Sequence, residues 1–245
     1  MSFNGTPELL PQEIDTDIYN INVKLAIMLD VDNTLIDNDK VKEDVSAQML
    51  ALIGEQWSAR FWEIYEQVRK ETDVVDIPNT LKRIQPELNN EELYHHLYRL
   101  WNDFPYRRYI YPGVFELLKY INTIGRPIIV SDGDPSFQLR KIVTSGLARA
   151  VNGDVLIYAH KQNHLEDIEL ALPAYHYVMV DDKPNLLALI KNYFEDKVTT
   201  VLVKQGKYAF NQELLKNSRP RPDMQIKQIA DLRKFTPEML YSDRF

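Results

Sequence analysis

Acidic residues follow two apolar segments of this 245-residue sequence in a pattern that suits catalysis. Asp30 and Asp32 come directly after the apolar run 25–29, within the sequence Asp-Val-Asp-Asn-Thr. Asp181 and Asp182 come directly after another such run. A carboxylate can act as a nucleophile or transfer a proton, and carboxylate oxygens are preferred ligands of a hard cation such as Mg²⁺. The pattern therefore suits phosphoryl transfer, in which an acidic nucleophile needs surroundings that neutralise charge.

Groups that can hold a phosphate follow two further apolar runs. Ser131 and Asp132 come directly after residues 127–130, and Lys161 comes shortly after residues 155–158. Taken singly, a serine after a strand is usually a turn former and a lysine is usually solvated. These residues therefore gain weight only from their position beside the acidic pairs.

The elements that must position these residues can be read from hydrophobic periodicity. Runs that are apolar at every residue are typical of strands covered on both faces, and helical patterns, such as 114–124 before Gly125, lie between them. This alternation predicts an α/β fold with a doubly wound parallel sheet, whose ligands lie beyond the carboxyl ends of the strands. The expected strands lie at 25–29, 127–130, 155–158, 177–180 and 198–203.

The stretch 40–108 interrupts this alternation because it carries helical stripes and no strand-like run. Pro78, Pro86 and the pair Asn89-Asn90 are expected to divide it into about two or three helices. We therefore expect a helical insertion within an α/β core. The expected division is an N-terminal extension at 1–22, a core formed by 23–39 and 109–245, and a helical cap at 40–108.

The order of these motifs resembles the haloacid dehalogenase-like superfamily, most closely its capped phosphatases, over roughly residues 24–232. The resemblance is carried by Asp-Val-Asp-Asn-Thr at 30–34, Ser131, Lys161 and the pair Asp181-Asp182. It implies a Rossmann-like core, and a cap that closes over a small substrate and excludes water.

The resemblance also implies catalytic roles. Asp30 would be the nucleophile and form an aspartyl-phosphate, while Asp32 would protonate the leaving group and then activate the hydrolytic water. Ser131 and the backbone amide of Asp132 would hold the transferring phosphoryl group. Lys161 would pair with Asp30 and with the phosphate.

A magnesium site is implied in the same way. Asp30, Asp182 and the backbone carbonyl of Asp32 would bind Mg²⁺, with Asp181 as a direct or an outer ligand. The implied enzyme is a magnesium-dependent phosphatase that acts on a small phosphorylated metabolite.

Several other functions stay open from these residues. A dehalogenase would need the Asp30 nucleophile but no proton donor at position 32, so Asp32 favours a phosphate ester, whose leaving alkoxide must be protonated. A phosphomutase would use the same residues. A non-catalytic phosphate-binding protein is disfavoured by the complete residue set. Asp30 and Asp32 could also simply form a turn, as could Asp181 and Asp182.

Composition narrows the class of partner. The net charge of -7 gives no general attraction for nucleic acid or an anionic membrane, so we expect neither as a partner. The absence of cysteine excludes disulfides and a cysteine nucleophile. The first 22 residues lack a secretory signal and the apolar runs are too short to span a bilayer, so we expect a cytoplasmic protein. The oligomeric state is not encoded in any of these patterns.

Overall fold

The apolar runs form the strands of one parallel sheet, as predicted. The computed structural model describes residues 23–241, so the expected N-terminal extension at 1–22 lies outside the described residues. The sheet order is β3-β2-β1-β4-β5-β6 and every pairing is parallel. The strands are β1 (Val23–Leu29), β2 (Arg126–Asp132), β3 (Val155–Tyr158), β4 (Ala174–Asp181), β5 (Val198–Val203) and β6 (Met224–Ile226).

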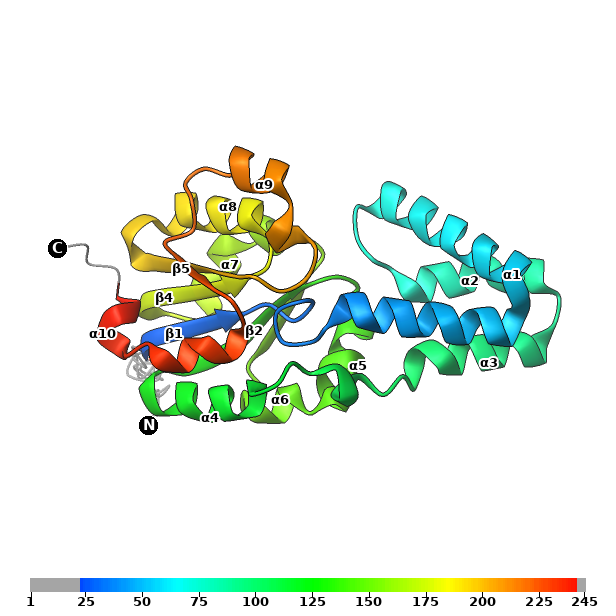
Figure 1. Cartoon of the computed structure of the whole chain (residues 1–245), viewed down its shortest axis with the longest axis horizontal. Helices are drawn as coiled ribbons and strands as arrows, with labels where there is room; N and C mark the ends of the chain where they lie inside the picture. The colour runs from blue at the N-terminus through cyan, green and yellow to red at the C-terminus, as the bar shows by residue number, and fades with distance from the viewer. Residues whose placement is uncertain (1–22, 242–245) are drawn as a thin grey trace, which may run out of the picture.

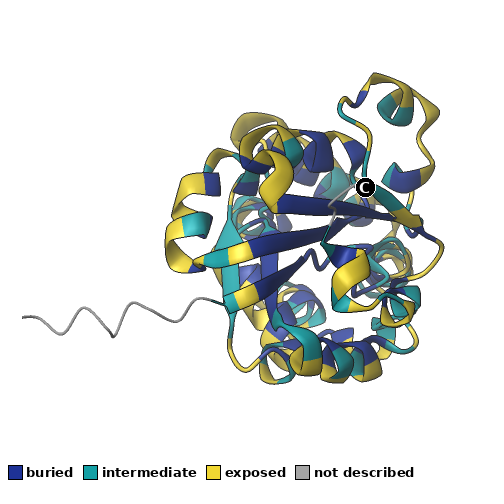
Figure 2. Cartoon of the chain, turned by 90° about the vertical axis from the view of Figure 1, so that its left-hand side faces the viewer, coloured by how far each residue is buried: buried dark blue, intermediate teal, exposed yellow. Residues whose placement is uncertain are grey.

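Successive strand residues pack on opposite faces of this sheet. Ile27 and Leu29 belong to one buried cluster, which includes the apolar side of α4, whereas Ala26 and Met28 belong to a second cluster with the apolar sides of α7 and α8. Both faces are therefore covered, which explains why the central positions of the strands are mostly apolar. Figure 2 shows the buried strands enclosed by helices whose outer surfaces are exposed.

The helices of the core lie on both sides of the sheet (Figure 1). The α-helices are α4 (Val114–Ile124), α5 (Pro135–Ser145), α6 (Leu147–Ala150), α7 (Leu165–Ala171), α8 (Pro184–Phe194), α9 (Gln212–Asn217) and α10 (Pro237–Leu240). Short 3₁₀ turns are η2 (Tyr106–Tyr109), η3 (Lys161–Asn163), η4 (Glu195–Lys197), η5 (Tyr208–Phe210) and η6 (Ile229–Lys234). None of the helices within residues 23–241 has the length and apolar content needed to cross a membrane.

A group of helices between β1 and β2 extends to one side of the core (Figure 1). It consists of α1 (Asn38–Thr72), α2 (Ile77–Leu88) and α3 (Glu91–Asn102), and we call it the cap. Pro86 does not separate two helices, contrary to expectation, because it lies inside α2. The helix ends two residues later, so the N–H that proline lacks affects only the last turn.

The cap is held together and joined to the core by aromatic side chains. The rings of Phe61 and Trp101 stack with their centroids 5.5 Å apart. Trp101 also meets Phe137 of α5 edge-to-face, at 6.1 Å. Aromatic contacts of this kind combine a large buried area with a defined geometry, so the cap has a specific seat on the core.

Gly54 divides α1 into two helical parts. Its backbone has φ 76° and ψ 173°, a conformation essentially restricted to glycine. Figure 1 shows the two parts of α1 running in different directions. The direction of the helix that leads back toward the core is therefore set by this one residue.

Replacing Gly54 with alanine should lower the free energy of unfolding by about 1–3 kcal/mol, because alanine must adopt the glycine-only conformation. A Cβ atom at this position would meet no other atom within 4 Å, so a loss would report backbone strain and not a clash. Urea denaturation measures the change, with the neighbouring exposed substitution Glu55→Ala as control. Equal stability of Gly54→Ala and Glu55→Ala would show that the turn tolerates a side chain.

Candidate active site

The polar residues that follow the strands meet at one edge of the sheet. Asp30 directly follows β1 and its backbone N–H donates to the carbonyl of Val180 in β4. Asp181 is the last residue of β4 and Asp182 follows it, while Ser131 and Asp132 end β2. The parallel register places these strand ends together, and η3 brings Lys161 to them from beyond β3.

Lys161 lies at the centre of the site. Its Nζ atom is 2.6 Å from Asp30 Oδ1 and 2.7 Å from Asp181 Oδ2, and it also donates to the carbonyl of Val130. The side chain is fully buried. Burial alone would lower the pKa of Lys161, but Asp181 and Asp30 outweigh it and hold that pKa well above its usual value. Lys161 therefore remains a cation throughout the functional pH range.

Asp30 and Asp182 are buried carboxyl groups whose pKa values lie above the usual range. Burial first, and then the charge of Asp181, raises the pKa of Asp30 to about 7, although Lys161 opposes the shift. Burial, with Asp181 and Asp30, raises the pKa of Asp182 to about 9. Ionising all of these groups together therefore requires more positive charge than Lys161 supplies.

The donor atoms fit a divalent cation that binds oxygen. One oxygen each from Asp30, Asp181 and Asp182 lies within 4.8 Å of the others. Asp30 Oδ2 and both carboxylate oxygens of Asp182 have no hydrogen-bond partner among residues 23–241. Buried carboxylate oxygens without a partner are costly, and an oxygen-only donor set suits Mg²⁺.

The carboxylate of Asp32 is oriented by residues of α5. Lys141 Nζ lies 2.8 Å from Oδ1 and 3.1 Å from Oδ2 of Asp32, and Gln138 contacts Oδ2 at 3.4 Å. The Lys141 side chain is only 4% exposed. The side chain of Asp32 thus belongs to an ion pair separate from the Asp30–Asp181–Asp182 cluster.

Ser131 and Asp132 are also held in place by polar contacts. The Ser131 hydroxyl accepts from Gln138 Nε2 at 2.9 Å. The Asp132 carboxylate accepts from the backbone N–H of Lys161 at 2.8 Å and lies 3.6 Å from Lys183 Nζ. Burial would raise the pKa of Asp132, but Lys161 and Lys183 outweigh burial and lower that pKa. Asp132 therefore stays ionised and helps to fix both lysines.

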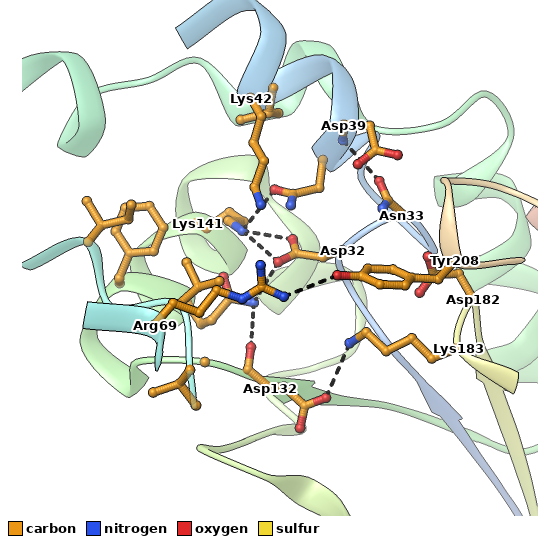
Figure 3. Close-up of a pocket in the computed structure, with 18 of the residues that line it drawn as sticks. Asp32, Asn33, Asp39, Lys42, Arg69, Asp132, Lys141, Asp182, Lys183 and Tyr208 are labelled. Atoms are coloured by element: carbon orange, nitrogen blue, oxygen red, sulfur yellow. Dashed lines mark hydrogen bonds and ion pairs between the residues drawn. The ribbon is translucent and has the colours of Figure 1, made fainter. Parts of the chain in front are cut away.

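These residues border a cavity of about 400 Å³ between the core and the cap. Asp32, Asp132 and Asp182 line it from the core. Lys42 and Arg69 line it from α1 (Figure 3). A volume of this order suits a small ligand, and the mixed polar and aromatic lining suits specific recognition.

The sequence-based prediction missed three residues of this site, Gln138, Lys141 and Lys183. A signal for the first two exists, because they lie in the buried stripe of α5 with Phe137 and Ile142. A lysine at a helical position that should face the core is a candidate partner for a buried carboxylate. Lys183 offered no comparable signal, since it lies in a short turn before Pro184.

The comparisons with solved structures identify the family. A haloacid dehalogenase-like hydrolase from Burkholderia xenovorans LB400 is 38% identical to this chain, with a TM-score of 0.82, and the match covers 89% of this chain and 98% of that one. This chain belongs to the haloacid dehalogenase-like hydrolases. The search of family models and the search of curated proteins found no match.

More distant members share the fold of this haloacid dehalogenase-like hydrolase. An L-2-haloacid dehalogenase from Xanthobacter autotrophicus has 16% identity and a TM-score of 0.56, over 86% of this chain and 97% of that one. A β-phosphoglucomutase from Thermotoga maritima has 14% identity and a TM-score of 0.54, over the same shares. The fold is thus common to proteins with different reactions, and the reaction must be argued from the site.

Magnesium should stabilise the protein increasingly as pH rises. The folded-state pKa values of Asp30 and Asp182, about 7 and about 9, exceed the unfolded value of about 4. Protonation therefore favours the fold, and that contribution is lost as pH rises through the folded values. The melting temperature of the metal-free protein should thus fall as the pH rises from about 5 to about 9.

Mg²⁺ should reverse this loss, since it binds the ionised carboxylates, and saturating metal should add about 2–4 kcal/mol near pH 9. Thermal melts with chelator and with excess Mg²⁺ measure the effect. Asp182→Asn is the control, because it removes a proposed ligand. An equal magnesium shift in wild type and Asp182→Asn would place the ion elsewhere.

Proposed function

We propose that this haloacid dehalogenase-like hydrolase cleaves phosphate monoesters of small molecules with Asp30 as nucleophile. The observation that carries the proposal is the position of Asp32, whose carboxylate lines the cavity two residues after the buried Asp30. A second carboxyl group at this point can protonate a departing alkoxide, which ester cleavage requires and halide release does not.

Asp30 has the environment of a held nucleophile. Lys161 engages Oδ1 at 2.6 Å, and Oδ2 has no hydrogen-bond partner among the described residues. Attack by an oxygen of Asp30 forms a bond to phosphorus while the bond from phosphorus to the alcohol oxygen breaks, giving an aspartyl-phosphate. Lys161 fixes the carboxylate for this attack and supplies positive charge beside it.

Asp32 would transfer the protons of both half-reactions. As an acid it donates a proton to the alcohol oxygen as that group leaves. As a base it then removes a proton from the water that cleaves the aspartyl-phosphate. Lys141 and Gln138 would act as positioning residues, since they hold the Asp32 carboxylate in a fixed orientation.

The remaining polar residues would hold the phosphoryl group and the metal. Ser131 and the backbone amide of Asp132 are the proposed phosphate donors. Asp30, Asp182, the carbonyl of Asp32 and Asp181, directly or through water, are the proposed magnesium ligands, and their unpartnered oxygens support this assignment. Bound Mg²⁺ would supply charge neutralisation between the carboxylates and the phosphate.

A phosphomutase is the second candidate, because a fold neighbour is a β-phosphoglucomutase and the same residues would serve. A mutase returns the phosphoryl group to another oxygen of the sugar. Release of inorganic phosphate in proportion to consumed ester would therefore favour the phosphatase. Halide release from a 2-haloacid without metal would instead favour the chemistry of the dehalogenase neighbour.

Substitution of the two carboxylates tests the proposed roles. Asp30→Asn should reduce turnover by several orders of magnitude, since it removes the covalent catalyst. Asp32→Asn should reduce it by about 10² to 10⁴ on an alkyl phosphate, and less on an aryl phosphate whose leaving group needs no proton. Single-turnover kinetics with Mg²⁺ measure both, with melting curves to verify folding. Wild-type turnover by Asp30→Asn would end the proposal, and equal losses on both esters would remove the acid role of Asp32.

Lys141→Met should reduce turnover of an alkyl phosphate by about 10- to 100-fold, because the Asp32 carboxylate loses the contact that orients it. Turnover of an aryl phosphate should fall less, since its leaving group needs no proton from Asp32. Lys141→Arg retains the charge and should restore most of the turnover. Equal turnover of Lys141→Met and wild type on both esters, after correction for folded protein, would show that the ion pair serves stability alone.

A further inference from the structure

The cap contributes cations to the cavity that the proposed reaction does not use. Lys42 and Arg69 both belong to α1 and line the cavity. Lys42 Nζ lies 3.0 Å from the hydroxyl of Tyr65, and Arg69 Nη2 lies 3.5 Å from the hydroxyl of Tyr208. Figure 3 shows both side chains extending from the cap toward the space beside Asp32.

Three lysines of the core differ from the two cations of the cap in their partners. Lys161 and Lys183 each face a carboxylate of the core, and Lys141 faces Asp32. Within residues 23–241, Lys42 makes no ion pair within 4 Å. The ion pair of Arg69 is with Glu66, one turn away on the same helix, at 3.7 Å.

The charge of Asp32 favours the cationic form of Lys42, but Lys141 already engages both oxygens of the Asp32 carboxylate. Burial would lower the pKa of Lys42, whereas its contact with Tyr65 and the charge of Asp32 outweigh burial and raise it. Lys42 therefore remains charged while partly removed from water. An anion that enters the cavity would stabilise a cation in this position, because it would supply a partner for the partly desolvated charge.

The hydroxyl groups of Tyr65 and Tyr208 lie beside these two cations. Each hydroxyl can donate to an anion as well as accept from the neighbouring cation. Tyr65 belongs to the cap, while Tyr208 belongs to the loop after β5, so Arg69 and Tyr208 meet across the boundary between cap and core. An anion held here would lie between the two parts of the molecule.

We propose that Lys42 and Arg69 form a subsite for a second anionic group, so that the substrates are phosphate esters whose alcohol part carries a carboxylate or another phosphate. The inference rests on the proposed phosphatase function for the position of the transferred phosphoryl group. With the phosphoryl group beside Asp30, the alcohol part of the ester would extend toward Lys42 and Arg69 of the cap. The cavity of about 400 Å³ has room for a small molecule that spans the two sites.

Binding of non-hydrolysable phosphonates tests the subsite without any turnover. Isothermal titration in Mg²⁺ compares phosphonopropionate and phosphonobutyrate with propylphosphonate and butylphosphonate, which lack the carboxylate. The carboxylated member of a pair should bind wild type about tenfold more tightly, on the scale of one charge-assisted hydrogen bond. Propylene bisphosphonate forms a separate arm, which distinguishes a second phosphate from a carboxylate as the preferred group.

The variants Lys42→Met and Arg69→Met should each reduce this preference toward unity and leave the affinity for the uncharged-tail phosphonates unchanged. Lys42→Arg should keep most of the preference. Matched controls are Lys40→Met and Lys70→Met, exposed positions of α1 outside the cavity lining. If a methionine variant fails to fold, the comparison of tailed and untailed ligands on wild type still tests the proposal.

Equal affinity of wild type for tailed and untailed phosphonates, or no binding of the tailed ones, would overturn the subsite. A uniform loss of affinity for both ligand types in Lys42→Met and Arg69→Met would also overturn it. Hydrolysis of butyl phosphate and of its carboxylated analogue, 4-phosphooxybutyrate, is followed in parallel. Absence of hydrolysis of both esters together with preserved discrimination between phosphonates would reject the phosphatase and retain the anion subsite.

Discussion

The structure depends on balancing negative charge that the sheet concentrates at one edge. Parallel strands deliver Asp30, Asp181 and Asp182 to the same buried position, where mutual repulsion and loss of water would oppose folding. Lys161 offsets part of this cost through two short ion pairs. Lys161 is the first residue of η3, so the position of the turn after β3 determines whether these ion pairs can form. The remaining deficit of positive charge would favour the binding of a cation at this site.

The strands of the core could be predicted because a strand that is buried on both faces contains a run of apolar residues. Each of the strands β1 to β5 contains an all-apolar run, and the fold then specifies where Asp30, Ser131 and Asp182 lie. β6 escaped prediction because it has only three residues and includes an exposed glutamine. Lys141 and Gln138 escaped because lysine and glutamine in helices are usually solvated, so only tertiary contacts reveal their roles.

The division of labour between the two parts follows from the same geometry. The core supplies fixed charges at the ends of rigid strands, which suits a reaction that requires precise placement. The cap supplies side chains from α1, whose path depends on the conformation of Gly54. The cap residues that line the cavity therefore share no local motif with the acidic pairs. The part of a substrate that contacts the cap could not be inferred from the sequence alone.

One helix, α5, makes three separate contacts around the cavity. Gln138 holds Ser131, Lys141 holds Asp32, and Phe137 meets Trp101 of the cap. All three residues lie within a little more than one helical turn, so their relative rotation is fixed by helix geometry. Inserting or deleting a single residue before Phe137 would rotate the helix by about 100° and misplace all three side chains together. We therefore expect homologous chains to vary in length at the outer loops and to keep the spacing from Ser131 to Lys141 constant.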